Sequence, residues 1–370
     1  MKILSVVGAR PNFMKIAPIC EGLRKRGVNH ILVHTGQHYD YRMSKLFFED
    51  LGLPKPDMDL GVGSGTHTQQ TTEVMMRLEP VLNNMKPSLL IVVGDVNSTM
   101  ASAITAVKLG IPVAHIEAGL RSFDRTMPEE INRVLTDAIS TFHFTTEESA
   151  NINLRKEGIH EENIFFVGNT MIDTLLKHVD RASVSTILGR LGIRPREYGI
   201  ATLHRPSNVD SRENLQNILE ALNEIVEYMP VIFPVHPRTK KQIFDFNLNH
   251  LVLDDMANGH KGVYMIEPLG YLDFLKLMKD ARMVFTDSGG IQEETTVLGL
   301  PCLTLRTNTE RPVTISSGTN VLVGADRERI VKEAIERLNG FSSEHSIPPL
   351  WDGHAAERIV DVLLNRFAAV

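Results

Sequence analysis

The sequence predicts an α/β fold made of two domains, each built on a parallel sheet. Its length of 370 residues fits two domains, since one domain takes roughly 150 residues. Short runs rich in valine and isoleucine alternate with longer segments of helical periodicity. The runs are continuously apolar, as expected for strands that helices cover on both faces. This alternation is typical of parallel sheets with crossover helices.

Six apolar runs mark the expected strands of the first half, and the first of them begins almost at the N-terminus. The runs are 3–7, 31–34, 89–93, 113–116, 142–144 and 164–167. Two of the intervening helices have clear boundary signals. One covers 98–109 and stops at Gly110, and the other covers 129–139 behind Pro128, a residue favoured at the first helical position.

The same alternation restarts after residue 190. Its expected strands are 199–203, 231–235, 263–266, 283–286 and 302–305, with helices over 215–228 and 271–279 among them. Serine, glycine and proline concentrate in 180–198, which makes this stretch the most linker-like. We therefore expect one domain over 1–180 and a second over 181–352. Ligands should bind in a cleft between them, at the carboxyl ends of the strands.

Composition excludes several classes of protein. Hydrophobic residues make up 42% and charged residues 23%, which is ordinary for a globular chain. With 39 basic against 45 acidic residues and no basic block, no nucleic-acid partner is expected. No apolar run approaches the roughly 18 residues of a membrane span, so we expect no membrane partner. Two cysteines without C-x-x-C spacing fit a reducing compartment, which predicts a cytoplasmic protein.

The loop after the first strand has the features of an anion-binding site. Gly8 permits a tight turn into a helix whose unpaired N–H groups attract negative charge, and Arg10 and Lys15 add positive charge. Neither a P-loop nor a G-x-G-x-x-G motif is present. A nucleoside triphosphatase and a dinucleotide-dependent oxidoreductase are therefore disfavoured.

Three acidic residues of the first half stand at strand ends or at a helix start. Asp95 and Glu117 come directly after two of these strands, and Glu129 starts a helix with Arg133 one turn later. Carboxylates gathered at strand ends suit proton transfer. The structural alternatives are a helix N-cap for Asp95 and a partner of the helix dipole for Glu129. Glu117 has no comparably simple capping pattern.

Histidine and arginine stand together after two strands of the second half. His204 and Arg205 follow one strand, and His236 and Arg238 follow the next. A lone histidine is commonly structural, but an adjacent arginine in a strand-end loop favours binding or catalysis. Both interpretations stay open for His204 and His236.

A glycine pair opens a helix after the strand over 283–286. Ser288, Gly289 and Gly290 would expose backbone N–H groups to a diphosphate. Glu294, about one turn into that helix, is placed to accept hydrogen bonds from ribose hydroxyls. Arg311 lies in a following segment that adds cationic groups.

Taken in order along nearly the whole chain, these residues resemble the non-hydrolysing UDP-N-acetylglucosamine 2-epimerases. The shared motifs are G-x-R-P near the start, T-G-Q-H at 35–38, G-D at 94–95, H-I-E-A-G-L-R at 115–121, P-E-E-x-N-R at 128–133, G-N-T at 168–170 and D-S-G-G-I-Q-E-E at 287–294. The resemblance implies two Rossmann-like domains of the glycosyltransferase-B type with an interdomain active-site cleft. It also implies that a C-terminal helix over 353–370 returns to the first domain.

The resemblance, together with the strand-end positions, defines the expected site. The catalytic group is Asp95, Glu117, Glu129, Arg133 and His204. The group that binds substrate is Arg10, Lys15, Arg205, His236, Phe274, Ser288, Gly289, Gly290, Glu294 and Arg311. The family implies a UDP-sugar substrate, no organic cofactor, no metal and a homodimer.

The implied reaction is reversible epimerisation at C2 of UDP-N-acetylglucosamine to UDP-N-acetylmannosamine, by elimination and re-addition of UDP through a 2-acetamidoglucal. Four alternatives remain: a hydrolysing epimerase, an epimerase of a related UDP-acetamido sugar, a glycosyltransferase of the same fold and a non-enzymatic nucleotide-sugar sensor. Gly8-Ala9-Arg10-Pro11-Asn12 stands where the family commonly has G-T-R-P-E, which keeps a related sugar or uronic acid open. The residues do not assign acid and base among the carboxylates.

Overall fold

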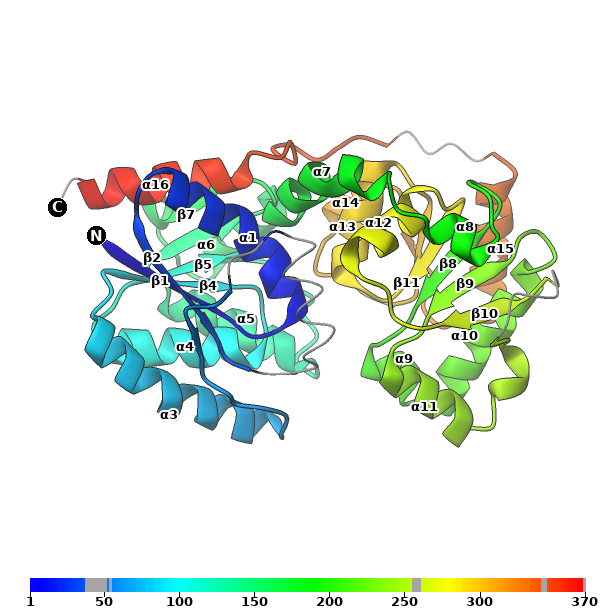
Figure 1. Ribbon diagram of the computed structural model, residues 1–370, viewed down its shortest axis with the longest axis horizontal. Helices are drawn as coiled ribbons and strands as arrows, with labels where there is room; N and C mark the ends of the chain where they lie inside the picture. Colours follow the sequence, from blue (N-terminus) through cyan, green and yellow to red (C-terminus); the bar gives the residue numbers. More distant parts are fainter. Residues whose placement is uncertain (37–51, 53–54, 255–260, 341–344, 369–370) are drawn as a thin grey trace. The chain divides into compact units, whose positions relative to one another are not determined.

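The computed structural model describes residues 1–36, 52, 55–254, 261–340 and 345–368. The chain divides into two compact units (Figure 1). Unit 1 consists of Met1–Lys177 with Pro349–Val370, and unit 2 consists of His178–Pro348. Helix α7, Thr170–Ala182, carries the chain from the first unit into the second.

Unit 1 is built on a parallel sheet. The described residues form a sheet of seven strands, in the order β3-β2-β1-β4-β5-β6-β7. They are β1 Lys2–Val7, β2 Asn29–His34, β3 Met58–Asp59, β4 Leu89–Val93, β5 Val113–Ile116, β6 Phe142–Thr145 and β7 Ile164–Phe166. The order reverses between β1 and β4, as in Rossmann-like folds, whose ligands bind at this point.

The helices of unit 1 alternate with its strands, and local sequence signals mark the start of α3 and α5. They are α1 Arg10–Lys25, α3 His67–Met85, α4 Asn97–Lys108, α5 Pro128–Ile139, α6 Glu148–Lys156, the 3-10 helix η1 Glu161–Asn163 and α16 Ala355–Ala368. Thr66 accepts a hydrogen bond from the backbone N–H of Gln69 and caps α3. Pro128 stands at the start of α5, as predicted.

The C-terminal segment is part of unit 1, where α16 contacts α1. Asp173 accepts hydrogen bonds from the backbone N–H groups of Ala355 and Ala356 at 3.1 and 2.7 Å. A residue of α7 thus satisfies orphan donors of another helix. The buried Trp351 indole donates to the Thr146 carbonyl at 2.8 Å. These contacts hold the last helix against the first domain's sheet layer.

Unit 2 repeats the same topology. Its described strands form a parallel sheet of six in the order β10-β9-β8-β11-β12-β13. They are β8 Gly199–Thr202, β9 Val231–Pro234, β10 Val263–Ile266, β11 Met283–Thr286, β12 Cys302–Thr304 and β13 Asn320–Leu322. Its helices are α8 Ile187–Leu191, α9 Pro206–Val209, α10 Arg212–Ile225, α11 Pro237–Asp245, η2 Asn249–Leu251, α12 Tyr271–Lys279, α13 Gly289–Leu298, α14 Val313–Ser316 and α15 Arg327–Leu338.

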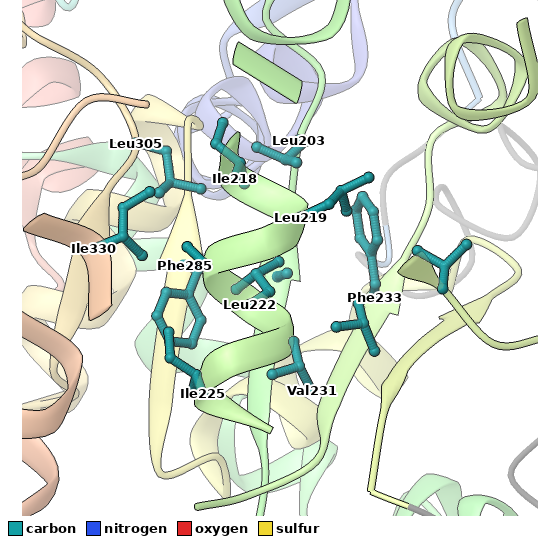
Figure 2. Packing of buried hydrophobic residues seen from close by; sticks show 14 of the residues in the cluster. Leu203, Ile218, Leu219, Leu222, Ile225, Val231, Phe233, Phe285, Leu305 and Ile330 are labelled. Atoms are coloured by element: carbon teal, nitrogen blue, oxygen red, sulfur yellow. The ribbon is translucent and has the colours of Figure 1, made fainter. Parts of the chain in front are cut away.

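The core of unit 2 lies between α10 and the sheet, as Figure 2 shows. Ile218, Leu222 and Ile225 recur at helical spacing and are fully buried. They pack with Phe233 of β9 and Phe285 of β11. Burying each such side chain contributes about 1.5–3 kcal/mol. The loops that follow β8 and β11 are therefore anchored to a rigid layer.

The structure confirms the predicted α/β class and the parallel sheets, and it adds two strands that the apolar runs did not indicate. β3 has two residues and β13 has three, so neither is long enough to show a period. No described helix is long and apolar enough to cross a membrane.

Candidate active site

The turn after β1 leaves room for a glycine only. A Cβ at Gly8 would lie 2.1 Å from the Ser98 hydroxyl oxygen. Beyond the turn, Asn12 accepts from the Ala9 N–H at 3.0 Å and donates to the Val93 carbonyl at 2.7 Å. The first turn of α1 is thereby tied to the end of β4. The side chain of Arg10 lies outside the described part of the chain.

Lys15 of α1 and Glu117, directly after β5, form a buried ion pair. Glu117 has a φ of 71°, a left-handed conformation that costs a non-glycine residue on the order of 1–3 kcal/mol. The Phe144 carbonyl accepts from the N–H groups of Glu117 and Ala118, both at 3.0 Å, and so holds this turn. A strained backbone at a strand end places the carboxylate against a lysine, a pattern found at functional sites.

Asp95 and Arg133 form the second ion pair of this strand edge, with Nη2 and Oδ2 2.5 Å apart. The guanidinium is buried and also contacts Glu130, with Nη1 and Oε2 2.7 Å apart. The N-cap alternative for Asp95 is wrong, because α4 starts at Asn97 and Val96 is its N-cap. Asn132 donates to the Asp95 carbonyl at 2.9 Å, which fixes this loop.

Glu130 is a structural residue that the sequence reasoning missed. It is buried in the first turn of α5, beside the half-buried Glu129. Its carboxylate accepts from the N–H groups of Ser122 and Phe123 at 3.0 and 2.8 Å. The signal was present in the three-residue spacing of Glu130 and Arg133 on one helical face.

A buried charged cluster supports the same strand edge and was also missed. Asp137 lies 2.6 Å from Nδ1 of His115 and 2.7 Å from Nη2 of Arg121. The other ring nitrogen of His115 contacts the Gly94 carbonyl at 2.8 Å. Burial opposes the charged form of Asp137, but His115 and Arg121 lower its pKa to about 2. The cluster holds the backbone next to Asp95.

In unit 2, His204 pairs with Asp287 at the ends of β8 and β11. Nδ1 and Oδ1 are 2.9 Å apart, and the His204 side chain is 44% exposed while that of Asp287 is fully buried. Asp287 also accepts from the Arg205 N–H at 2.9 Å. Burial disfavours ionisation of Asp287, yet His204 and the backbone N–H groups lower its pKa. The structure thus gives His204 a defined partner.

The Ser288–Gly289–Gly290 turn opens α13 as predicted, with Ser288 as N-cap. A Cβ at Gly289 would lie 2.5 Å from Nη1 of Arg311, so the arginine lies directly against the turn. Arg311 is buried and bridges two carboxylates, Glu293 at 2.5 Å and Glu310 at 2.9 Å. The Arg311 guanidinium therefore packs against the glycine turn and lies beside the N–H groups of that turn.

Glu294 is buried one turn into α13, where the Tyr271 hydroxyl donates to it at 3.2 Å. Burial raises the pKa of Glu294 to about 8; the Tyr271 hydrogen bond opposes this rise and the charge of Glu293 adds to it. A carboxyl near its pKa at neutral pH can accept or donate, which suits recognition of hydroxyl groups.

The remaining predicted residues of unit 2 differ in position. Arg205 contacts Glu310 at 3.5 Å, and Phe274 is half-buried on α12. His236 is the N-cap of α11 and accepts a hydrogen bond from the Arg238 N–H at 3.2 Å. This contact gives His236 the structural role that was one of its two interpretations. Among the described residues, no group of His, Cys, Asp and Glu is arranged to hold a metal ion.

Comparison with known proteins places the chain among enzymes of one reaction type. A family model described as UDP-N-acetylglucosamine 2-epimerase matches residues 21–364. The UDP-N-acetylglucosamine 2-epimerase of Methanocaldococcus jannaschii is 46% identical, over 98% of this chain and 99% of the relative. A UDP-2,3-diacetamido-2,3-dideoxy-D-glucuronate 2-epimerase of Pseudomonas aeruginosa is 41% identical, over 98% and 99%.

A solved structure agrees with the fold. The Methanocaldococcus jannaschii UDP-GlcNAc 2-epimerase in complex with UDP-GlcNAc and UDP superposes with a TM-score of 0.91 at 45% identity, covering 99% of this chain and 100% of that one. The likeness confirms the expected fold class, two Rossmann-like domains of the glycosyltransferase-B type.

Proposed function

This chain belongs to the UDP-N-acetylglucosamine 2-epimerase family, and we propose that it interconverts UDP-N-acetylglucosamine and UDP-N-acetylmannosamine by eliminating and re-adding UDP. The observation that carries this proposal is two ion pairs, the buried Lys15–Glu117 and the partly buried Asp95–Arg133, whose carboxylates follow the neighbouring strands β5 and β4 of unit 1. Two carboxylates held by cations there provide the proton-transfer groups that epimerisation needs.

The chemistry of the sugar explains why such groups are required. The C2 proton is not acidic, because no carbonyl lies next to C2 to stabilise an enolate. Departure of UDP makes C1 electron-poor and lets a base remove the C2 proton, which yields a 2-acetamidoglucal. Proton return on the other face and attack by UDP complete the epimerisation. Each carboxylate that exchanges this proton contributes typically 10²- to 10⁴-fold to the rate.

In this proposal the residues of unit 1 act at the sugar. Asp95, Glu117 and Glu129 remove the proton, return it and stabilise positive charge at C1. Lys15 and Arg133 hold two of these carboxylates in place. Arg10, the first residue of α1, adds positive charge for the departing diphosphate.

The residues of unit 2 bind UDP in this proposal. The N–H groups at the start of α13 and the adjacent Arg311 complement the diphosphate. Glu294 binds the ribose hydroxyls and Phe274 contacts the uracil. His204 and Arg205 follow β8 on the same sheet edge and support the leaving UDP.

The test is incubation with UDP-N-acetylglucosamine in heavy water, followed by NMR. We expect UDP-N-acetylmannosamine with deuterium at C2, and recovered substrate that carries deuterium as well. Free N-acetylmannosamine would instead show a hydrolysing epimerase. Retention of the C2 proton in all material would refute the proposal. Asp95→Asn and Glu117→Gln should lower turnover at least about 10²-fold, whereas Asp326→Asn, which alters an exposed cap of α15, serves as the control.

A second candidate substrate comes from the Pseudomonas aeruginosa relative, whose name gives a diacetamido glucuronate. The same heavy-water assay with UDP-2,3-diacetamido-2,3-dideoxy-D-glucuronate tests it. A higher kcat/KM for this compound than for UDP-N-acetylglucosamine would make it the preferred substrate.

We also propose a cytoplasmic homodimer. The support is the family resemblance and two cysteines, Cys20 and Cys302, that are both buried as free thiols. Sedimentation equilibrium at micromolar concentration tests the dimer, and a mass of one chain would refute it.

A further inference from the structure

Asp287 occupies the place in unit 2 where the strand order reverses. It follows β11, and its partners His204 and Arg205 follow the neighbouring β8. Ligands of open parallel sheets bind at this reversal. The Asp287 side chain is fully buried and has no exposed surface with which to touch a ligand, so we expect it to act through its neighbours.

The two oxygens of Asp287 have different partners. Oδ2 accepts from the N–H groups of Arg205 at 2.9 Å and His204 at 3.1 Å, and from Nδ2 of Asn208 at 3.2 Å. Oδ1 makes its shortest contact, 2.9 Å, with Nδ1 of His204. An ionised carboxylate only accepts hydrogen bonds, so Nδ1 of His204 carries a proton.

We propose that Asp287 is a positioning residue that holds His204 in the Nδ1–H tautomer and directs Nε2 away from the sheet, toward UDP. This inference rests on the proposed function, in which His204 supports the departing nucleotide. A neutral imidazole has one protonated nitrogen and one acceptor. Fixing Nδ1 therefore makes Nε2 the atom that takes a proton from water and passes it to a phosphate oxygen of the departing UDP. When UDP adds back to C1, the proton returns to Nε2 and then to water.

The same carboxylate joins two binding loops. Asp287 directly precedes Ser288, the N-cap of α13, and its hydrogen bonds hold the loop that follows β8. Asp287 thereby fixes the position of His204 relative to the N–H groups of the glycine turn. Such outer partners of a functional histidine fix its tautomer and orientation, and losing one typically lowers activity about 10- to 100-fold at metal sites.

Asp287→Asn should change the tautomer of His204 while preserving the packing around residue 287. The amide oxygen can take the place of Oδ2 and keep the backbone donors, while the amide nitrogen donates to Nδ1. We expect long-range ¹H–¹⁵N spectra to show the Nδ1–H pattern for His204 in the wild-type enzyme and the Nε2–H pattern in the variant. The spectrum of His204→Ala assigns the signal among the 14 histidines.

Kinetics provides the second readout. Asp287→Asn should lower kcat about 10- to 100-fold, with a smaller change in KM. In the His204→Ala background it should change kcat by less than about twofold, since the two residues act as one unit. Asp326→Asn is the control, because this cap of α15 lies apart from the pair.

Three results would overturn the inference: an Nε2–H pattern in the wild-type enzyme, an inverted tautomer with unchanged kcat, or an equal loss of kcat with and without His204. The wild-type tautomer decides the matter even if Asp287→Asn does not fold. Absence of epimerisation by the wild-type enzyme would refute the proposed function instead, and the tautomer measurement would still test Asp287.

Discussion

Replacing Asp137 by Asn tests how far one buried charged cluster stabilises unit 1. The Asp137 carboxylate contacts His115 at 2.6 Å, Arg121 at 2.7 Å and the Gly119 N–H at 3.0 Å. All of its oxygen surface is buried. The variant keeps the shape of the side chain but removes one of the two carboxylate charges that Arg121 contacts, the other being that of Glu157.

The expected loss of stability follows from these contacts. The pKa of Asp137 falls from 3.8 to about 2, and each unit is worth about 1.4 kcal/mol. The shift therefore contributes about 2 kcal/mol, which is present above pH 4, where the unfolded group is ionised, and is lost as pH falls through 2. Breaking the buried pair also leaves the Arg121 guanidinium with the partly exposed Glu157, 2.5 Å away, as its remaining carboxylate. We therefore expect a total loss of about 3 kcal/mol at pH 7, at the low end of the range for a broken buried pair.

Trp351 gives a local assay. It is the single tryptophan of the chain and is buried in unit 1, where it donates to the Thr146 carbonyl. Its fluorescence during urea unfolding should report unit 1 separately from the whole-chain circular dichroism. The difference between wild type and Asp137→Asn should stay constant from pH 7 to about 5 and shrink below about 4.

Asp326→Asn is the matched control, because this aspartate caps α15 from an exposed position. It should lower stability by no more than about 1 kcal/mol. A loss below about 1 kcal/mol for Asp137→Asn at pH 7, or a loss that does not change between pH 5 and 3, would refute the reasoning about the cluster.

Three further predictions follow from single sites. Between pH 4.5 and 8 the Glu294 carboxyl is protonated in the folded protein and ionised in the unfolded one, so wild-type unit 2 loses stability as pH rises through this range. Glu294→Gln lacks this titration and should therefore gain stability relative to wild type over the same range. Parallel pH profiles of urea unfolding would contradict this. Gly168→Ala should destabilise unit 1, because φ is 88° and the new Cβ would lie 2.0 Å from the Leu350 carbonyl oxygen; Trp351 fluorescence measures it. Leu222→Ala should lower the unfolding free energy by about 2–5 kcal/mol, and a loss under 1 kcal/mol in urea would show that the core of unit 2 repacks.

The strand ends were predictable to the extent that their signals are local. Gly8, Asp95 and Glu117 stand directly after apolar runs, and parallel strands end at one edge. The same logic located Ser288 at the start of α13. Glu130 and Asp137 were missed because their positions inside a helix resemble those of ordinary solvated acids. Burial identifies both, and burial depends on what the rest of the chain places over them.

Local sequence was enough to predict the two sheets, the alternation of strand and helix and the polar loops that could bind a ligand. These features depend on periodicity and on residues such as Gly8 and Pro128 that constrain their own backbone. The ion-pair partners could be known only from the folded structure. Lys15 and Glu117 are 102 residues apart, and Asp95 and Arg133 are 38 apart. Which cation meets which carboxylate follows from the strand order that sets β1 beside β4 and β4 beside β5. The strand order cannot be deduced from local sequence, because the hydrogen bonds between strands join backbone groups and do not depend on which residues form each strand.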